Sequence, residues 1–191
     1  MIRVQVQGIE QVQRALQQLG SAVRDRLMVN ALHRAGKAME TMADRAVRET
    51  LNLKTADTKR VIAVRKPSKS LPIVTLFVSH KPIRLAHYGA RQTKRGVTVK
   101  VLRRGARKRV GRAFLLRHAS GKVVLLQREG PERLPIKPLF GPEPYQVIRQ
   151  KNLEPKIAAK GREVFVSRFA HEWQREVERA ASRTVSRPKG A

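Results

Sequence analysis

The chain has 191 residues and carries 42 Lys and Arg against 14 Asp and Glu, a formal net charge of +28. It contains no cysteine, which excludes disulfide frameworks, thiolate zinc sites and cysteine nucleophiles. No apolar run approaches the roughly 20 residues needed to cross a bilayer, and the N-terminus has no hydrophobic signal region. We therefore expect a protein that is made and used in a cytoplasm-like compartment, with no membrane among its partners.

The positive charge is concentrated in one part of the chain. Between Lys81 and Arg133 there are 16 basic and 2 acidic residues, so +14 of the +28 excess lies there. Charge of this density repels itself unless a polyanion or an acidic protein surface is near, so nucleic acid is the first partner to consider. A membrane surface comes second and is not the partner that we expect. Five Phe, two Tyr and one Trp are too few for a platform that stacks bases. The sequence therefore favours contact with phosphates.

The N-terminal quarter is predicted to be mainly helical. Alternating residues from Ile2 to Gln7 predict a short strand, and apolar residues at helical spacing predict a helix from Ile9 to Leu19, stopped by Gly20. A second helix is expected from Ala22 to about Leu53, roughly 45 Å long. Its predicted buried stripe consists of Val23, Leu27, Ala31, Ala35, Ala38, Met42 and Ala46.

The middle of the chain is predicted to form strands. Residues 52–60 are expected to form a loop, followed by strands at 61–64 and 71–79, the second of which is the most hydrophobic β-type run and is expected to be central. Alternating residues in 97–102 and 123–127, separated by glycine turns, indicate half-buried antiparallel strands.

The C-terminal third changes character. Five prolines in residues 131–144 predict an extended or turning crossover without regular structure. A helix is predicted for 155–182, followed by a polar tail, 183–191. Its predicted apolar side consists of Ile157, Val164, Phe165, Phe169, Trp173, Val177 and Ala180.

These elements predict an α+β fold. A long N-terminal helix and a C-terminal helix are expected to pack on a small, mostly antiparallel sheet of five or six strands with an extended basic hairpin. We expect a single domain over residues 1–182.

The basic hairpin, residues 91–112, is the candidate binding element. Residues 103–112 hold six cations and a single valine to bury, so they cannot be core. The alternative is a solvated tip that only keeps the protein soluble, but the self-repulsion of so dense a cluster favours contact with DNA phosphates or an acidic protein surface. The expected contact residues are Arg91, Lys94, Arg95, Lys100, Arg103, Arg104, Arg107, Lys108, Arg109 and Arg112.

Catalytic chemistry finds little support in the sequence. The candidate bases and ligands are His33, His80, His87, His118 and His171 with Glu172, and none has a metal-binding or catalytic spacing. We expect His33 to face solvent, and we expect no acidic pair beside His87 or His118. Clustered carboxylates and phosphate-binding glycine motifs are absent. The prediction is therefore no enzyme, no catalytic residues, no metal and no cofactor.

A set of short motifs in the middle of the chain resembles a known family. In order they are Pro82-Ile83, Leu85, Tyr88-Gly89-Ala90-Arg91-Gln92-Thr93, Gly96-Val97, Val99, Gly111-Arg112-Ala113-Phe114, Gln127-Arg128, Arg133-Leu134-Pro135-Ile136 and Leu139-Phe140-Gly141-Pro142. Together they resemble the minor tail protein Z family of tailed phages, also called tail completion proteins, over about residues 9–157.

The resemblance implies a structural protein of the virion, assembled in the host cytoplasm and located at the head-tail junction. It implies a sheet-plus-helix subunit like those of neck and tail-terminator proteins, and a homo-hexameric ring at the head-proximal end of the tail. The implied partners are the tail tube, the tail terminator and the head-neck connector, with no catalytic residues. A ring that passes duplex DNA has a reason to be basic without reading its sequence.

A free-standing, sequence-independent nucleic-acid-binding protein of ribosomal type is the alternative, since it would be equally basic and equally free of cysteine. The two differ in oligomerisation: a ribosomal-type protein should be a monomer without RNA, whereas a joint subunit should form rings or bind tail and neck proteins.

Overall fold

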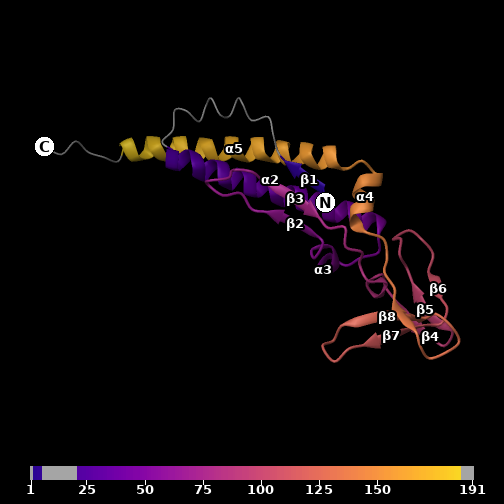
Figure 1. The fold of residues 1–191 in the computed structure, drawn as a ribbon. Helices are drawn as coiled ribbons and strands as arrows, with labels where there is room; N and C mark the ends of the chain where they lie inside the picture. The colour runs from indigo at the N-terminus through magenta and orange to yellow at the C-terminus, as the bar shows by residue number, and fades with distance from the viewer. Residues whose placement is uncertain (1, 6–20, 186–191) are drawn as a thin grey trace. The chain divides into compact units, whose positions relative to one another are not determined.

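The computed structural model describes residues 2–5 and 21–185, with side chains for residues 23–179. It confirms the α+β class, with two long helices and small antiparallel sheets (Figure 1). The predicted helix at residues 9–19 lies outside the described residues. The elements are β1 (Ile2–Gln5), α2 (Ser21–Thr50), α3 (Thr55–Thr58), β2 (Ile62–Arg65), β3 (Thr75–Val78), η1 (Leu85–His87), β4 (Arg91–Thr93), β5 (Gly96–Val99), β6 (Lys108–Val110), β7 (Ala113–Arg117), β8 (Val123–Arg128), β9 (Ile136–Pro138), α4 (Pro144–Gln150) and α5 (Glu154–Val185).

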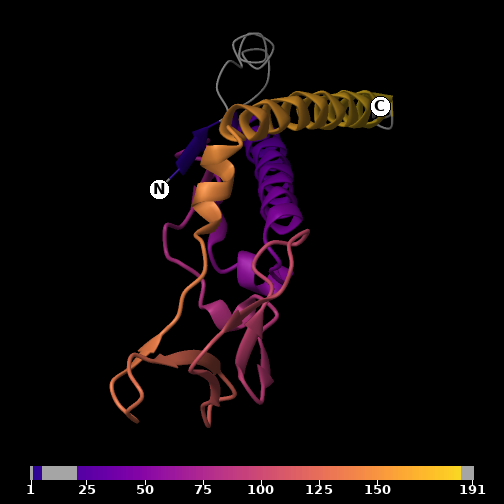
Figure 2. The ribbon, with the colours of Figure 1, turned by 90° about the vertical axis from the view of Figure 1, so that its right-hand side faces the viewer.

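The strands form three sheets of three strands each among the described residues, in the orders β1-β3-β2, β4-β5-β6 and β7-β8-β9 (Figures 1 and 2). The expected single sheet of five or six strands is therefore wrong. Each of the last two sheets pairs only strands that are neighbours in the chain, because connections of two to eight residues bring each strand back beside its predecessor. The prediction that residues 71–79 supply a central strand is confirmed by β3, although the strand is shorter and Leu71 and Ile73 are exposed.

Two segments predicted to be irregular contain regular structure. The expected loop at 52–60 includes the single helical turn α3. The proline-rich segment 131–144 includes β9, which pairs with β8 although Pro138 lacks a donor, because an edge strand needs hydrogen bonds on one side only. The C-terminal helix extends to Val185, past its expected end at residue 182.

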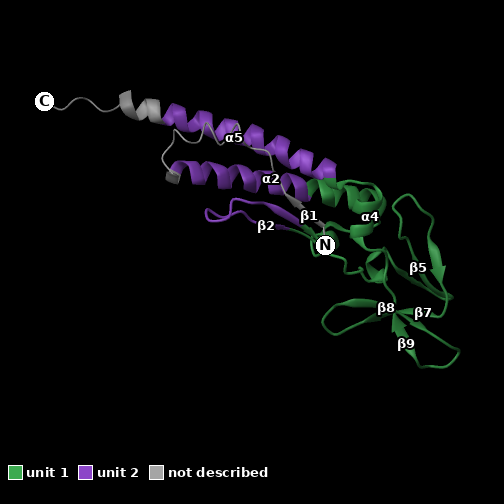
Figure 3. Cartoon of the chain, turned by 45° about the horizontal axis from the view of Figure 1, so that its top comes forward, with its two compact units in different colours: residues 1–2, 41–63, 77–154 green, residues 3–40, 64–76, 155–191 purple. Residues whose placement is uncertain are grey.

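The chain groups into two compact units (Figure 3). Unit 1 comprises residues 1–2, 41–63 and 77–154, and unit 2 comprises residues 3–40, 64–76 and 155–191. Helix α2 and the strands β1, β2 and β3 contribute residues to both. The single domain expected over residues 1–182 stays a prediction.

Unit 2 is built on the N-terminal half of α2 and on α5 (Figure 3). Arg26 of α2 forms an ion pair with Glu176 of α5 at 2.6 Å, and the buried Phe165 and Phe169 stack with ring centroids 5.9 Å apart. Small residues on α2 permit close packing: a Cβ at Gly36 would approach Val64 Cγ1 to 2.9 Å. The predicted core position of Val177 is wrong, because this side chain is 51% exposed.

The buried line on α2 differs from the predicted stripe. The predicted stripe moves three residues from Ala35 to Ala38. In the structure the buried positions instead continue every fourth residue after Ala35, so Ala38, Met42 and Ala46 are only half-buried. Because a residue turns about 100° around an α-helix, each four-residue step shifts the line by about 40°, or roughly 200° over five steps. The side of the helix that is buried at Leu27 therefore differs from the side that is buried at Val47. The buried line consists of Leu27, Ala31, Ala35, Met39, Ala43 and Val47, and Leu32 and Gly36 beside it are buried as well.

Unit 1 is organised around Tyr88, which is fully buried. Its hydroxyl donates a hydrogen bond to the Pro142 carbonyl at 2.7 Å, and its own carbonyl accepts one from the Lys100 amide at 2.9 Å. The Gly141 amide donates to the Ile83 carbonyl at 2.8 Å, which holds the 139–142 segment against the tyrosine ring. Two motifs far apart in sequence, at 88–93 and 139–142, are thereby brought into contact.

We expect Gly141→Ala to destabilise the protein by about 1–3 kcal/mol, because a Cβ there would lie 2.7 Å from Tyr88 Cζ in a packed core. The matched control is Gly111→Ala, since nothing lies within 4 Å of a Cβ at Gly111. Urea unfolding of both variants measures the difference, and equal midpoints would contradict the proposed close contact.

Candidate nucleic-acid interface

The β4-β5-β6 sheet has one apolar and one polar face. Val97 and Val99 of β5 are buried, and cross-strand partners share a face, so the register places Gln92 and Val110 with Val97. The opposite face carries the row Arg91, Thr98 and Arg109, one residue from each strand. Two exposed arginines thus flank a threonine across the sheet. We name this row the basic sheet face.

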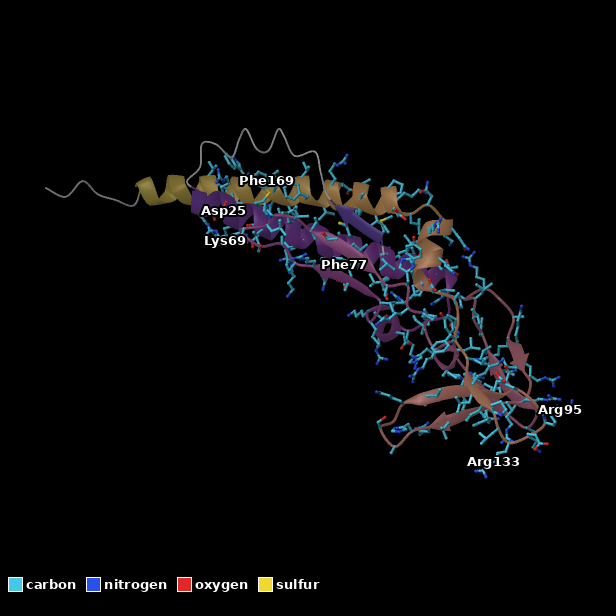
Figure 4. All side chains as sticks on the ribbon, viewed as in Figure 1. Asp25, Lys69, Phe77, Arg95, Arg133 and Phe169 are labelled. Carbon is cyan, nitrogen blue, oxygen red and sulfur yellow. The ribbon has the colours of Figure 1, made fainter. Side chains whose placement is uncertain are left out.

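The ten predicted contact residues do not form one continuous surface. Arg91 and Arg109 belong to the basic sheet face, while Lys108 pairs with Val99 on the apolar side of the edge strand β6. Lys94 and Arg95 lie at the tip of the β4–β5 hairpin, where the Arg95 side chain points outward (Figure 4). The other residues occupy connections: Lys100 follows β5, Arg103 and Arg104 lie in the turn after it, Arg107 precedes β6, and Arg112 lies in the turn before β7.

The predicted arm is more firmly attached than expected. The Asn52 amide donates to the Val101 carbonyl at 2.8 Å, and the Arg103 amide donates to the Thr50 carbonyl at 2.9 Å. These bonds attach the segment after β5 to the C-terminal end of α2, and β6 inside the arm pairs with β5. Residues 103–112 are therefore held at both ends, by the bond from Arg103 to α2 and by the pairing of β6 with β5.

Acidic residues are missing from this region. No Asp or Glu occurs between Asp57 and Glu129. Within the part of the chain with described side chains, none of the ten predicted cations forms an ion pair with a carboxylate. Nine of them are exposed and Lys100 is half-buried. Their charge is therefore available to a partner.

A second cationic group contains a residue that the sequence reasoning missed. Arg103, Arg104 and Lys151 line a hollow of about 810 Å³ at the end of α2. The Lys151 ammonium donates to Thr50 Oγ1 at 2.7 Å, and Glu49 also lines the hollow. Because a carboxylate is present, this group is a weaker candidate for binding phosphates than the basic sheet face. No local sequence pattern pointed to Lys151, which directly follows α4.

The expectation that no acidic group accompanies His87 is wrong, and His80, for which none was stated, also lies near a carboxylate. His87 Nδ1 lies 2.7 Å from the Asp57 carboxylate, whose side chain is 8% exposed, and His80 Nδ1 lies 3.8 Å from Glu143. The fold brings each pair together from distant segments, so sequence spacing could not reveal them. His33 is exposed, as predicted. Within residues 23–179, no three His, Asp or Glu side chains group to hold a metal ion.

Comparisons with known proteins add no relative: no protein-family model, curated protein or solved structure matches this chain. Among the described helices, none is both long and apolar enough to cross a bilayer.

Burial raises the pKa of the Tyr88 phenol well above its ordinary value, and the nearby Asp57 carboxylate acts in the same direction. Since the folded state then holds this proton more tightly than the unfolded state does, the contribution to stability is complete below about pH 10 and is lost as the pH rises above it.

We expect Tyr88→Phe to be less stable than wild type by about 0.5–1.5 kcal/mol near neutral pH, because the bond to Pro142 is lost. Above about pH 10 this difference should shrink, with a limiting slope of about 1.4 kcal/mol per pH unit, since only the wild type must keep a buried phenol protonated. Urea unfolding as a function of pH tests this. A difference that does not change with pH would contradict the raised pKa.

Proposed function

We propose that this protein is a structural tail completion protein of a tailed phage, forming a ring at the head-proximal end of the tail and contacting duplex DNA without regard to sequence. The observation that carries the DNA contact is the basic sheet face, where Arg91 and Arg109 lie exposed in a region without carboxylates. The order of the motifs along the chain supports the tail assignment.

The physical basis of the contact is phosphate neutralisation. Arginine donates in a planar fork that suits phosphate oxygens, and Thr98 between the two arginines adds a hydroxyl. None of the three is aromatic, so the row offers no platform for stacking bases. Such a face favours a duplex of any sequence.

The alternative of a free-standing nucleic-acid-binding protein of ribosomal type is supported by the same charge. It differs in having no need for self-association or for tail and neck partners.

We expect purified protein to bind duplexes of unrelated sequence with equal affinity, and Arg91→Ser/Arg109→Ser to reduce the slope of log affinity against log salt by up to about 1.8, since each phosphate contact contributes about 0.9. Fluorescence anisotropy over a salt series measures this. The charge-matched control is Lys156→Ser/Arg162→Ser, which removes two exposed cations from α5. Equal slopes for both variants would remove the basic sheet face from the interface.

We expect the protein to form homo-hexameric rings, alone or when mixed with tail tubes, because the proposed function needs a closed ring at the junction. Light scattering after size exclusion gives the mass in solution, and negative-stain images of the mixture show whether rings cap one tube end. A protein that stays monomeric in both conditions and binds RNA as well as DNA would favour the ribosomal-type alternative.

A further inference from the structure

Unit 1 contains a cleft of about 920 Å³ apart from the basic sheet face. Three segments form its walls: residues 54–61 around α3, residues 83–90 around η1, and the turn at 120–123 between β7 and β8. Four cations from these segments line the cleft, namely Lys54, Arg60, Arg84 and Lys122. None of the four belongs to the predicted basic arm.

The charge in the cleft is unbalanced. Its lining includes a single carboxylate, that of Asp57, and this group is almost fully buried at 2.7 Å from His87 Nδ1. Among residues with described side chains, no carboxylate forms an ion pair with any of the four cations. Asp57 thus pairs with the His87 imidazole and not with the four cations. These cations remain available to a bound anion.

The lining also indicates which anion fits. A volume of this size is typical of sites for small molecules or for part of a larger ligand. No Phe, Tyr or Trp lines the cleft, so a nucleobase would find no ring of that kind to stack on. Two guanidinium and two ammonium groups suit phosphate oxygens, and with Nδ1 facing Asp57 the His87 ring keeps Nε2 as a further hydrogen-bonding group.

The cleft borders the basic sheet face. Gly89 and Ala90 line the cleft, and the next residue, Arg91, begins β4 and belongs to the face. Arg107 donates from its guanidinium to the Gly89 carbonyl at 2.9 Å, which fixes this border. The cleft and the basic sheet face are therefore adjacent along the chain, at residues 90 and 91.

We propose that this cleft is a phosphate-binding site formed by Lys54, Arg60, Arg84, Lys122 and His87. The phosphate comes either from the backbone of a duplex or from a free phosphate group. This inference rests on the proposed function only for the choice of duplex DNA as one source of the phosphate.

The test uses His87 as a reporter inside the cleft. Its ring signal in a carbon–proton NMR spectrum is assigned by its loss in His87→Gln, and the full-length protein is titrated with inorganic phosphate and, separately, with a short duplex. We expect phosphate to shift the His87 signal, and Arg84→Ser/Lys122→Ser to weaken phosphate binding about tenfold, as expected for lost charge-assisted hydrogen bonds. The control Lys156→Ser/Arg162→Ser removes the same charge from α5 and should bind phosphate like the wild type.

The outcomes separate the two sources and the two sites. A His87 shift with both titrants supports the cleft and assigns it to the DNA backbone, whereas a shift with phosphate alone supports it and assigns it to free phosphate. The variant of the basic sheet face, Arg91→Ser/Arg109→Ser, should show the same His87 shift with inorganic phosphate as the wild type. A failure of the proposed DNA contact can therefore be distinguished from a failure of the cleft proposal. An unshifted His87 signal in both titrations, or equal phosphate affinities for the cleft variant and its control, overturns the proposal.

Discussion

The shortage of carboxylates is the constraint on which unit 1 depends. Between Asp57 and Glu129 no acidic residue is available, so cations in this stretch cannot be neutralised by neighbours in sequence. Arg107 bonds instead to a backbone carbonyl, that of Gly89, a neutral acceptor that satisfies a donor but leaves its charge intact. In residues 58–128 cohesion therefore comes mainly from apolar burial and backbone pairing, because no Lys or Arg side chain of this described stretch forms an ion pair.

Tyr88 shows how that cohesion is achieved. Its ring fills the centre of unit 1 against Gly141, while its hydroxyl and carbonyl bond to Pro142 and Lys100. The residue before it is His87 in the cleft, and the third residue after it is Arg91 on the basic sheet face. A single buried side chain thus fixes the backbone that carries both the proposed DNA-contacting face and the proposed phosphate cleft.

The class of fold could be predicted from the sequence because it follows from local patterns. The long helices, the central β3 and the buried alternation at Val97 and Val99 all appear where periodicity placed them. The number of sheets could not be predicted, because strand partners depend on turn geometry as well as on alternation. The basic sheet face was predicted only in part: density identified Arg91 and Arg109, but the cross-strand register decides that they share a face. The His87–Asp57 pair and the cations of the cleft left no local signal, since tertiary contacts alone bring these segments together.

The winding of the buried line on α2 has a consequence for how this helix tolerates change. A helix with a straight apolar stripe has one side along which any polar residue is accepted over its whole length. On α2 the tolerant positions instead move around the helix from one turn to the next, because the line from Leu27 to Val47 rotates as it proceeds. A systematic scan of polar substitutions along α2 would trace a spiral of sensitive positions. Inserting or deleting one residue in α2 would rotate every downstream position by about 100° and so displace the rest of this line.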